Sequence, residues 1–467
     1  MNIEVIDSII CRADKKLIPY IVPCLKYQKT FWKKRQYRKV SVTKSAYFIH
    51  KGSGRFLTGL LPRVLTHLDA NRIKVSVQYS EQYSEYSKRD NLLVTNPPRL
   101  DKIIFRPDQK QLIQNCYEHK RGVIFAPTRF GKTVVALGFM SMFPKAKVLF
   151  LCDTLDIIDQ TVEELKKFNF KDIVKLGRGV KDWQGSGIVV STIQTFSKFK
   201  VEDYCDYFDM TITDEAHHCT GGWNSNRQVV DGQYGMVLSH NLSPIKLGFT
   251  ATLPTEKEKI LSLEGLIGPV IGEMTPQESV ELEITMKPKI ELIPVPYKMS
   301  ISQYRKYKDL YEHGVVHNRI RNKLIAKLTK DRIKQGITVL IMVKEIQHGL
   351  NIQELAKRIF GIDIEFVRGE TDTGTRLSVK NAFIKKKLKA VISTSVWREG
   401  INLPSLGCVI NALGGKSEIQ TLQSVGRSLT KIEGKDCAEI IDFLDPYTYL
   451  SSHTIERLQM YVKNGWL

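Results

Sequence analysis

Two short segments carry residue types that could together hydrolyse a nucleoside triphosphate. Gly131-Lys132-Thr133 lies between an apolar run and a predicted helix. A loop in that setting holds phosphate oxygens with its backbone N–H groups and with the helix N-terminus. Lys132 would reach the terminal phosphates, and the Thr133 hydroxyl would bind Mg²⁺. Ala126 stands where the strict P-loop pattern has its first glycine, and we predict a nucleotide-binding loop over residues 126–133.

The second segment, Asp214-Glu215-Ala216-His217, lies roughly 80 residues further along and directly follows an apolar run at residues 208–213. It is therefore expected at the carboxyl end of a strand, the edge at which parallel sheets bind ligands. Asp214 would hold the metal through water, and Glu215 would orient and deprotonate the attacking water. The alternative is an acidic helix N-cap, because carboxylates favour a helix start whatever their function.

ATP is the expected nucleotide because Gln109 lies one helix upstream of the loop, and its amide could pair with an adenine edge. A surface amide without function is the alternative for Gln109. The predicted nucleotide-binding residues in this part of the chain are Arg106, Gln109, Pro127, Thr128, Arg129, Phe130, Gly131, Lys132 and Thr133.

The elements that must position these residues are short apolar runs that alternate with helical stretches, which is typical of parallel sheets flanked by helices. A first series occupies residues 122–126, 133–142, 147–152, 155–168, 188–191, 210–213 and 246–249. A second occupies residues 339–343, 346–359, 364–368, 376–385, 390–393, 408–411, 419–428 and 438–443. We expect two α/β domains in tandem, joined by the proline-containing segment 285–296.

Length and charge indicate a further, basic domain at the amino-terminal end. The chain has 467 residues, enough for about three domains, and its 42% hydrophobic and 25% charged residues exclude wholesale disorder. Its net charge is +21, and residues 1–98 hold 18 Lys and Arg against seven Asp and Glu. Such a field attracts nucleic acid, although a merely soluble basic surface is the alternative. Asn96-Pro97-Pro98 places a boundary near residue 99.

Membrane insertion and export are not indicated, because no apolar run is long enough to cross a bilayer and the first residues lack a signal-peptide pattern. The eight cysteines contain no C-x-x-C pair and no zinc-like spacing, so we expect reduced thiols in a cytoplasmic protein. No sequence feature identifies a protein partner, and a monomer is the expectation.

Taken together, these segments resemble a superfamily 2 helicase of the DEAH-box-like kind over about residues 105–445. Residues 191–195 resemble the strand-contacting motif before the acidic box, and Thr250-Ala251-Thr252 resembles the S/T-A-T linker between hydrolysis and domain movement. Taken singly, each is also a polar turn after a strand. The resemblance implies RecA-like domains at residues 99–284 and 285–467, preceded by a small basic α+β domain at residues 1–98. It also implies nucleic-acid contacts at Thr192 and Thr394.

Residues 393–404 resemble motif V, with Gly400 and Asn402 as nucleotide contacts, and residues 423–427 resemble the start of motif VI. The resemblance implies that Arg427 reaches across the cleft between the domains to the γ-phosphate. Its positive charge would complete the neutralisation of the phosphate charge only when the two domains close. Two positions depart from the pattern: Asn402 replaces a common Asp, and Thr430 stands where a second arginine is expected, beside Lys431. The predicted catalytic residues are Lys132, Asp214, Glu215, His217, Gln423 and Arg427.

The amino-terminal part combines positive charge with aromatic rings. Phe31 and Trp32 precede a basic run, and their rings could stack on bases or wedge at a junction. The alternative is a solvated edge with both rings in a core. Residues 52–64 and 317–323 resemble segments of phage recombination helicases of the UvsW type, which remodel branched DNA. The predicted DNA contacts here are Lys33, Lys34, Arg35, Arg38, Lys39, Arg55 and Arg63.

The leading hypothesis is therefore an ATP- and Mg²⁺-dependent translocase that acts on branched or forked DNA, with residues 1–98 gripping the duplex. An RNA helicase is the first alternative, because these motifs do not separate DNA from RNA. The others are the motor subunit of a restriction or repair complex and a DNA-binding module with a relict ATP site.

Overall fold

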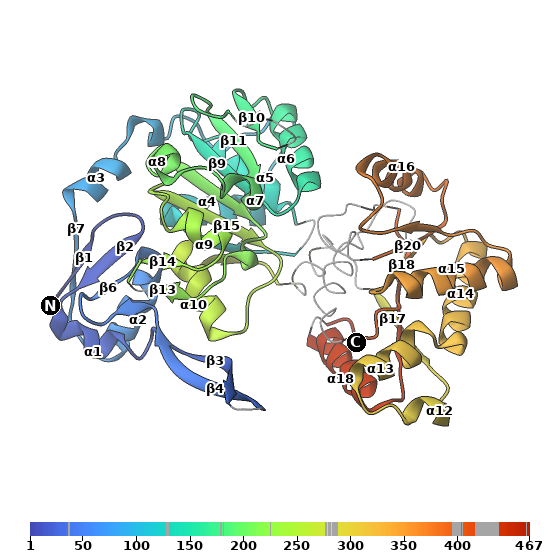
Figure 1. The fold of residues 1–467 in the computed structure, drawn as a ribbon. Helices are drawn as coiled ribbons and strands as arrows, with labels where there is room; N and C mark the ends of the chain where they lie inside the picture. The colour runs from blue at the N-terminus through green and yellow to red at the C-terminus, as the bar shows by residue number, and fades with distance from the viewer. Residues whose placement is uncertain are drawn as a thin grey trace. The chain divides into compact units, whose positions relative to one another are not determined.

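The computed structural model describes residues 1–35, 38–127, 130–177, 180, 182–224, 226–275, 278, 282, 288–394, 403, 405–415, 439–463 and 465–467. For the described members of residues 31–40, and for residues 156 and 373, it describes the backbone only. The chain forms two compact units (Figure 1). The first contains Met1–Ala126 and Gly131–Met274, and the second contains Pro127–Phe130 and Thr275–Leu467.

A parallel sheet of seven strands forms the larger part of the first unit, in the order β10-β11-β9-β12-β15-β8-β16. Its strands are β8 (Arg121–Phe125), β9 (Val148–Cys152), β10 (Ile173–Lys175), β11 (Ile188–Thr192), β12 (Met210–Asp214), β15 (Ile245–Thr250) and β16 (Val270–Glu273). The accompanying elements are α4 (Pro107–His119), α5 (Lys132–Met140), α6 (Leu155–Lys167), α7 (Ile193–Phe196), α8 (Val201–Tyr204), η4 (Ala216–His218), β13 (Trp223–Asn224), β14 (Val229–Val230), α9 (Gln233–Leu238) and α10 (Lys257–Leu266). Every residue of β9 and β11 is buried, as expected for strands covered on both faces.

The second unit contains a parallel sheet of six strands in the order β17-β22-β21-β18-β20-β19. The strands are β17 (Lys289–Pro294), β18 (Val339–Met342), β19 (Glu365–Val367), β20 (Ala390–Ser393), β21 (Cys408–Asn411) and β22 (Glu439–Leu444). Its helices are α12 (Met299–Ser302), α13 (Tyr307–Tyr311), η5 (Glu312–Val316), α14 (Arg319–Lys334), α15 (Ile346–Phe360), α16 (Thr373–Ile384) and α18 (Thr448–Lys463). The prediction of two parallel-sheet α/β domains is thus confirmed, while the helix expected at residues 419–428 lies outside the described residues.

The predicted join at residues 285–296 is partly wrong, because Lys289–Pro294 forms strand β17 instead of a linker. β17 lies at the edge of the second sheet and pairs only with β22 among the described strands. Proline is tolerated in an edge strand because one side of that strand makes no ladder hydrogen bonds. Pro294 is the last residue of β17. The prolines therefore lie at the ends of this strand and do not prevent it from forming.

The amino-terminal segment forms a five-stranded mixed sheet in the order β5-β6-β2-β1-β7. It contains β1 (Asn2–Val5), β2 (Ile10–Ala13), η1 (Lys15–Leu17), α1 (Ile18–Ile21), β5 (Ile49–His50), β6 (Arg55–Leu57), η2 (Thr58–Leu60), α2 (Leu61–Ala70), β7 (Ser76–Tyr79), α3 (Glu81–Ser87) and η3 (Asp90–Leu92). A Cβ at Gly59 would lie 2.0 Å from the Glu264 carbonyl oxygen, so η2 packs directly on α10. The amino-terminal sheet is therefore part of the first unit, and the predicted boundary near residue 99 stays a prediction.

A two-stranded ribbon extends from this sheet (Figure 1). It consists of β3 (Lys26–Arg35) and β4 (Arg38–Tyr47), which pair antiparallel from Lys26↔Tyr47 to Arg35↔Arg38. Residues 26–47 contain eight Lys and Arg and no Asp or Glu. We call this element the basic ribbon.

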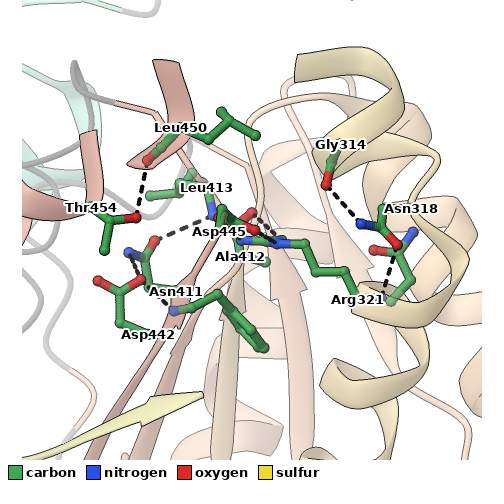
Figure 2. Close-up of polar contacts among 12 residues, drawn as sticks. Gly314, Asn318, Arg321, Asn411, Ala412, Leu413, Asp442, Asp445, Leu450 and Thr454 are labelled. Atoms are coloured by element: carbon green, nitrogen blue, oxygen red, sulfur yellow. Dashed lines mark hydrogen bonds and ion pairs between the residues drawn. The ribbon is translucent and has the colours of Figure 1, made fainter. Parts of the chain in front are cut away.

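The second unit buries two arginines against β21 and β22, and Figure 2 shows the contacts of one of them, Arg321. Arg321 Nε donates to Asp445 Oδ1 at 3.0 Å, and Arg321 Nη1 donates to the Ala412 carbonyl at 3.1 Å. Arg457 Nε donates to Asp442 Oδ2 at 2.8 Å. These contacts tie α14 and α18 to the same edge of the second sheet.

Lys246 of β15 is a buried lysine in the first unit, only 1% exposed. Its Nζ donates to the Leu238 carbonyl at 3.3 Å. Burial, with a smaller contribution from the charge of Arg121, holds the pKa of Lys246 well below its ordinary 10.5. The folded protein therefore keeps this amine neutral at a pH at which the unfolded chain protonates it, so this site contributes more stability as pH rises towards 10.5.

Replacing Lys246 with methionine is therefore expected to stabilise the first unit by about 1–3 kcal/mol near pH 7, because the neutral side chain removes the cost of burying a polar amine. The stability gain should shrink as pH rises towards 10.5. Thermal unfolding of both proteins across that pH range measures it. Lys171→Met, at an exposed lysine, is the matched control and should change stability little. Equal unfolding temperatures for Lys246→Met and wild type at neutral pH would contradict the prediction.

Candidate functional site

Three neighbouring strands of the first sheet bring the predicted hydrolysis residues to one edge. β15 lies between β8 and β12, with Thr250 paired to Phe125 and Phe249 paired to Asp214. All three strands are parallel, so their carboxyl ends meet there. The phosphate-binding loop, the Thr250-Ala251-Thr252 segment and the acidic segment follow these ends, as the sequence predicted.

The loop after β8 leads into α5, whose first residue is Lys132. Gly131 has φ +95°, and a Cβ there would lie 2.7 Å from Gln109 Nε2, so both backbone conformation and space favour glycine. The N-terminus of α5 presents backbone N–H groups and the positive end of the helix dipole, which suit an anion. Lys132 Nζ donates to the Ala126 carbonyl at 3.1 Å, which places the ammonium over the loop.

Gln109 is buried at the start of α4 and is not a surface amide, so that alternative is wrong. Its Oε1 accepts a hydrogen bond from the Arg106 backbone N–H at 3.2 Å, as part of a capping box. Arg106 Nη2 pairs with Asp108 Oδ2 at 3.0 Å. Gln109 thus packs against the glycine of the phosphate-binding loop, and its contact with a nucleotide base stays a prediction.

The acidic segment turns sharply after β12. Glu215 has φ +46° and ψ +48°, a left-handed conformation that is uncommon for a residue with a side chain and is often found at functional sites. Glu215 stands at the N-cap position of the helical turn that follows, but its side chain makes no capping hydrogen bond there. His217 Nδ1 lies 2.9 Å from Thr250 Oγ1 and 3.3 Å from Glu215 Oε2. The imidazole therefore links the acidic segment to β15.

Asp214 and Glu215 have opposite pKa shifts. Burial, together with the charge of Glu215, raises the pKa of Asp214 to about 7. Burial also acts to raise the pKa of Glu215, but the hydrogen bond from His217 and the charge of Lys132 outweigh it, and the pKa falls to about 2. Glu215 is thus a carboxylate at neutral pH, the form that a general base requires.

The donor set fits Mg²⁺, a hard cation that binds carboxylate and hydroxyl oxygens. Asp214 Oδ1 accepts the Glu215 backbone N–H at 3.0 Å, and its buried carboxyl carries the raised pKa that a nearby cation would lower. Thr133, in the first turn of α5, is partly exposed and would supply the hydroxyl.

The two threonines predicted to contact nucleic acid are both buried. Thr192, at the end of β11, caps α7: its Oγ1 accepts the Thr195 backbone N–H at 3.2 Å. Thr394 directly follows β20, and its backbone N–H donates to the Val367 carbonyl at 3.2 Å. Each follows a strand as expected, and their contacts with nucleic acid stay predictions.

Of the two arginines predicted as DNA contacts outside the basic ribbon, Arg63 has an internal partner. Its guanidinium makes a two-pronged pair with Glu264 of α10, at 2.5 Å and 2.6 Å, and this pair raises its pKa. Arg55 lies in β6 and is partly exposed. Arg63 therefore holds the amino-terminal sheet to α10, whatever it does with DNA.

Several predicted residues lie outside the described part of the chain. These are Thr128, Arg129, Gly400, Asn402, Gln423, Arg427, Thr430 and Lys431, together with the side chains of Lys33, Lys34, Arg35, Arg38 and Lys39. Pro127 and Phe130 are described, and the Phe130 N–H donates to the Pro127 carbonyl at 3.3 Å. The predicted roles of all these residues stay predictions.

Trp223 is not among the residues predicted from the sequence. It lies soon after the acidic segment and is buried against Phe48 at the base of the basic ribbon. The Gly221-Gly222 pair before it was the available signal, because consecutive glycines often mark a close approach of the backbone to another element.

No helix among the described residues is long and apolar enough to cross a membrane.

Two family models match the chain in succession. Residues 102–255 match the model of the type III restriction enzyme res subunit. Residues 304–429 match the model of the helicase conserved C-terminal domain.

The chain is also similar to individual helicases and translocases. The chain is 27% identical over 383 residues to the ATP-dependent DNA helicase uvsW of Enterobacteria phage T4, covering 76% of this chain and 74% of that protein. It is 25% identical over 365 residues to the DNA 3'-5' translocase XPB2 of Sulfurisphaera tokodaii, covering 71% and 80%. Among solved structures, T4 UvsW has a TM-score of 0.44 at 20% identity, covering 99% of this chain and 98% of that one. The Pyrococcus furiosus Hef helicase domain has a TM-score of 0.49 at 15% identity, covering 74% and 97%.

Proposed function

We propose that this chain, in which a res-subunit match is followed by a helicase C-terminal match, is a superfamily 2 DNA helicase that remodels branched DNA by ATP-driven translocation. Branch migration and fork regression are the proposed reactions. The observation that supports the ATP-driven step best is the meeting of Lys132, Asp214 and Glu215 at one edge of the first sheet.

In the proposed hydrolysis step, Lys132 and the N-terminus of α5 bind the phosphates of ATP. When bound, Mg²⁺ neutralises phosphate charge, and Thr133 and Asp214 would hold it. Glu215 orients the attacking water and accepts its proton, while His217 fixes the Glu215 carboxylate through their 3.3 Å contact. Arg427 would add positive charge at the γ-phosphate when the domains close.

DNA is the proposed substrate because the basic ribbon holds eight positive and no negative side chains. Two strands with this charge suit phosphate contacts along a nucleic acid, which depend little on base sequence. The similarity to a DNA helicase and to a DNA translocase agrees with this choice. We further propose that the protein acts as a monomer in the cytoplasm, a setting that suits the free cysteines among the described residues.

A second candidate is the motor subunit of a restriction or repair complex, which the res-subunit model favours. In that case a partner chain would supply the nuclease, and the protein would purify as a stable complex with it. An RNA helicase differs from both in the nucleic acid that stimulates ATP hydrolysis.

The test is ATP hydrolysis and strand exchange by the full chain on matched single-stranded, duplex, forked and four-way DNA, with structured RNA alongside, at one stated salt concentration. Forked and four-way DNA are expected to give the highest rates, because they offer the junction that the proposed reactions move. Equal rates on every DNA would remove the junction specificity. Stronger stimulation of ATP hydrolysis by RNA than by DNA would contradict the proposal that DNA is the substrate.

A further inference from the structure

The base of the basic ribbon is fixed by three aromatic side chains. Tyr27, at the start of β3, and Phe48, directly after β4, are buried with ring centroids 5.4 Å apart. Phe48 stacks on Trp223 at 6.2 Å with an interplanar angle of 10°. Because Tyr27 lies in β3 and Phe48 directly follows β4, a tilt of the ribbon must move both rings against Trp223.

Polar contacts hold the same junction. Lys29 Nζ of β3 lies 3.6 Å from Glu258 Oε1 of α10. Burial and the nearby charge of Glu258 raise the pKa of Tyr27. A Cβ at Gly222 would lie 2.7 Å from Lys29 Nζ, so the residue before Trp223 touches the ribbon as well. The ribbon is therefore docked onto the segment around Trp223 by both rings and charges.

The segment around Trp223 directly continues the acidic segment. The chain runs from Asp214 through the turn Ala216–His218 to Trp223 and is held along the way. Ser262 Oγ donates to the Cys219 carbonyl at 3.2 Å, and β13 pairs with β14 through Trp223↔Val230. A backbone held this closely transmits displacement, because packed interiors yield little.

No side-chain hydrogen bond among the described residues holds Trp223 in its position. It is 7% exposed, and its Nε1–H has no hydrogen-bond acceptor among the described residues. A buried indole that leaves its donor unpaired contributes through its ring face, here stacked on Phe48.

We infer that Trp223 is a positioning residue that couples DNA contact at the basic ribbon to the geometry of Glu215 and His217. DNA that tilts the ribbon shifts Tyr27 and Phe48, and Trp223 passes this shift to the acidic segment. The inference rests on the proposed function, because it requires DNA to stimulate ATP hydrolysis. It assigns to this chain a contact route that lies wholly within the first unit.

The test compares Trp223→Leu and Trp223→Phe with wild type in the full chain. Leucine keeps apolar volume without a ring, whereas phenylalanine keeps a ring that can stack and loses no paired hydrogen bond. The measurements are kcat and KM for ATP with and without forked DNA, and DNA affinity. Trp223→Leu is expected to lower DNA-stimulated kcat about tenfold, a change of about 1.4 kcal/mol. Its DNA-free kcat, its KM for ATP and its DNA affinity should stay within about twofold.

Trp223→Phe is expected to restore most of the stimulation. Full stimulation in Trp223→Leu would overturn the inference, and so would an equal loss of DNA-free and DNA-stimulated kcat, which indicates general damage. If Trp223→Leu does not fold, Phe48→Leu decides, because it removes the other ring of the same stacked pair; full stimulation in Phe48→Leu would overturn the inference. A wild-type protein that DNA does not stimulate would instead overturn the proposed function.

Discussion

Replacing Lys132 with alanine is expected to lower DNA-stimulated ATP hydrolysis about 100-fold or more. Lys132 begins α5 beside the phosphate-binding loop, and its ammonium acts on both Asp214 and Glu215. A preorganised charge directed at a transferring phosphoryl group contributes several kcal/mol to the transition state, because no solvent has to reorganise around it. Phosphate release at saturating ATP and forked DNA measures the effect.

The matched control is Lys110→Ala, which removes an exposed lysine of α4 in the same unit. It should leave hydrolysis within about twofold of wild type. DNA binding at low salt should survive in Lys132→Ala, because the loss concerns phosphoryl transfer. Unchanged phosphate release by Lys132→Ala would show that the catalytic assignment is wrong and favour a DNA-binding module with a relict ATP site.

The positions of the two halves of the proposed hydrolysis site were predictable because each follows a strand, and parallel strands align their carboxyl ends. The sequence could not show that β15 lies between β8 and β12, since strand order depends on contacts distant in the chain. It also could not show the left-handed backbone of Glu215, because a non-glycine residue adopts that conformation only where the surrounding structure imposes it. The His217 contact with Thr250 depends on both.

Other differences arise because local patterns do not report tertiary neighbours. Gln109 was ambiguous from its amide alone, and only the packing against Gly131 shows that it is buried. The prolines near residue 290 suggested a linker, yet an edge strand accepts them. Arg63 was predicted as a DNA contact from charge, whereas its partner Glu264 lies about 200 residues away. Charge patterns predict the sign of a surface more readily than the partner of one residue.

The second large effect concerns stability. Arg321→Met is expected to destabilise the second unit by about 3–5 kcal/mol, because it leaves Asp445 buried without its cation. Burial raises the pKa of Asp445, and the charge and hydrogen bonds of Arg321 act against this rise, so the loss of Arg321 makes an ionised carboxylate at this site more costly. Urea unfolding followed by a probe in the second unit measures the loss, since one transition need not describe both units.

The double variant Arg321→Met/Asp445→Leu separates the loss of attraction from the cost of a lone buried charge. Replacing both partners removes that charge, so the double variant should regain most of the stability that Arg321→Met loses. The Ala412 carbonyl would still lose its donor, which costs about 1 kcal/mol. Arg358→Met, in an exposed pair with Glu354, is the control and should cost about 0.5 kcal/mol or less. A double variant as unstable as Arg321→Met would mean that the shape of the arginine, rather than its charge, holds α14 to the sheet.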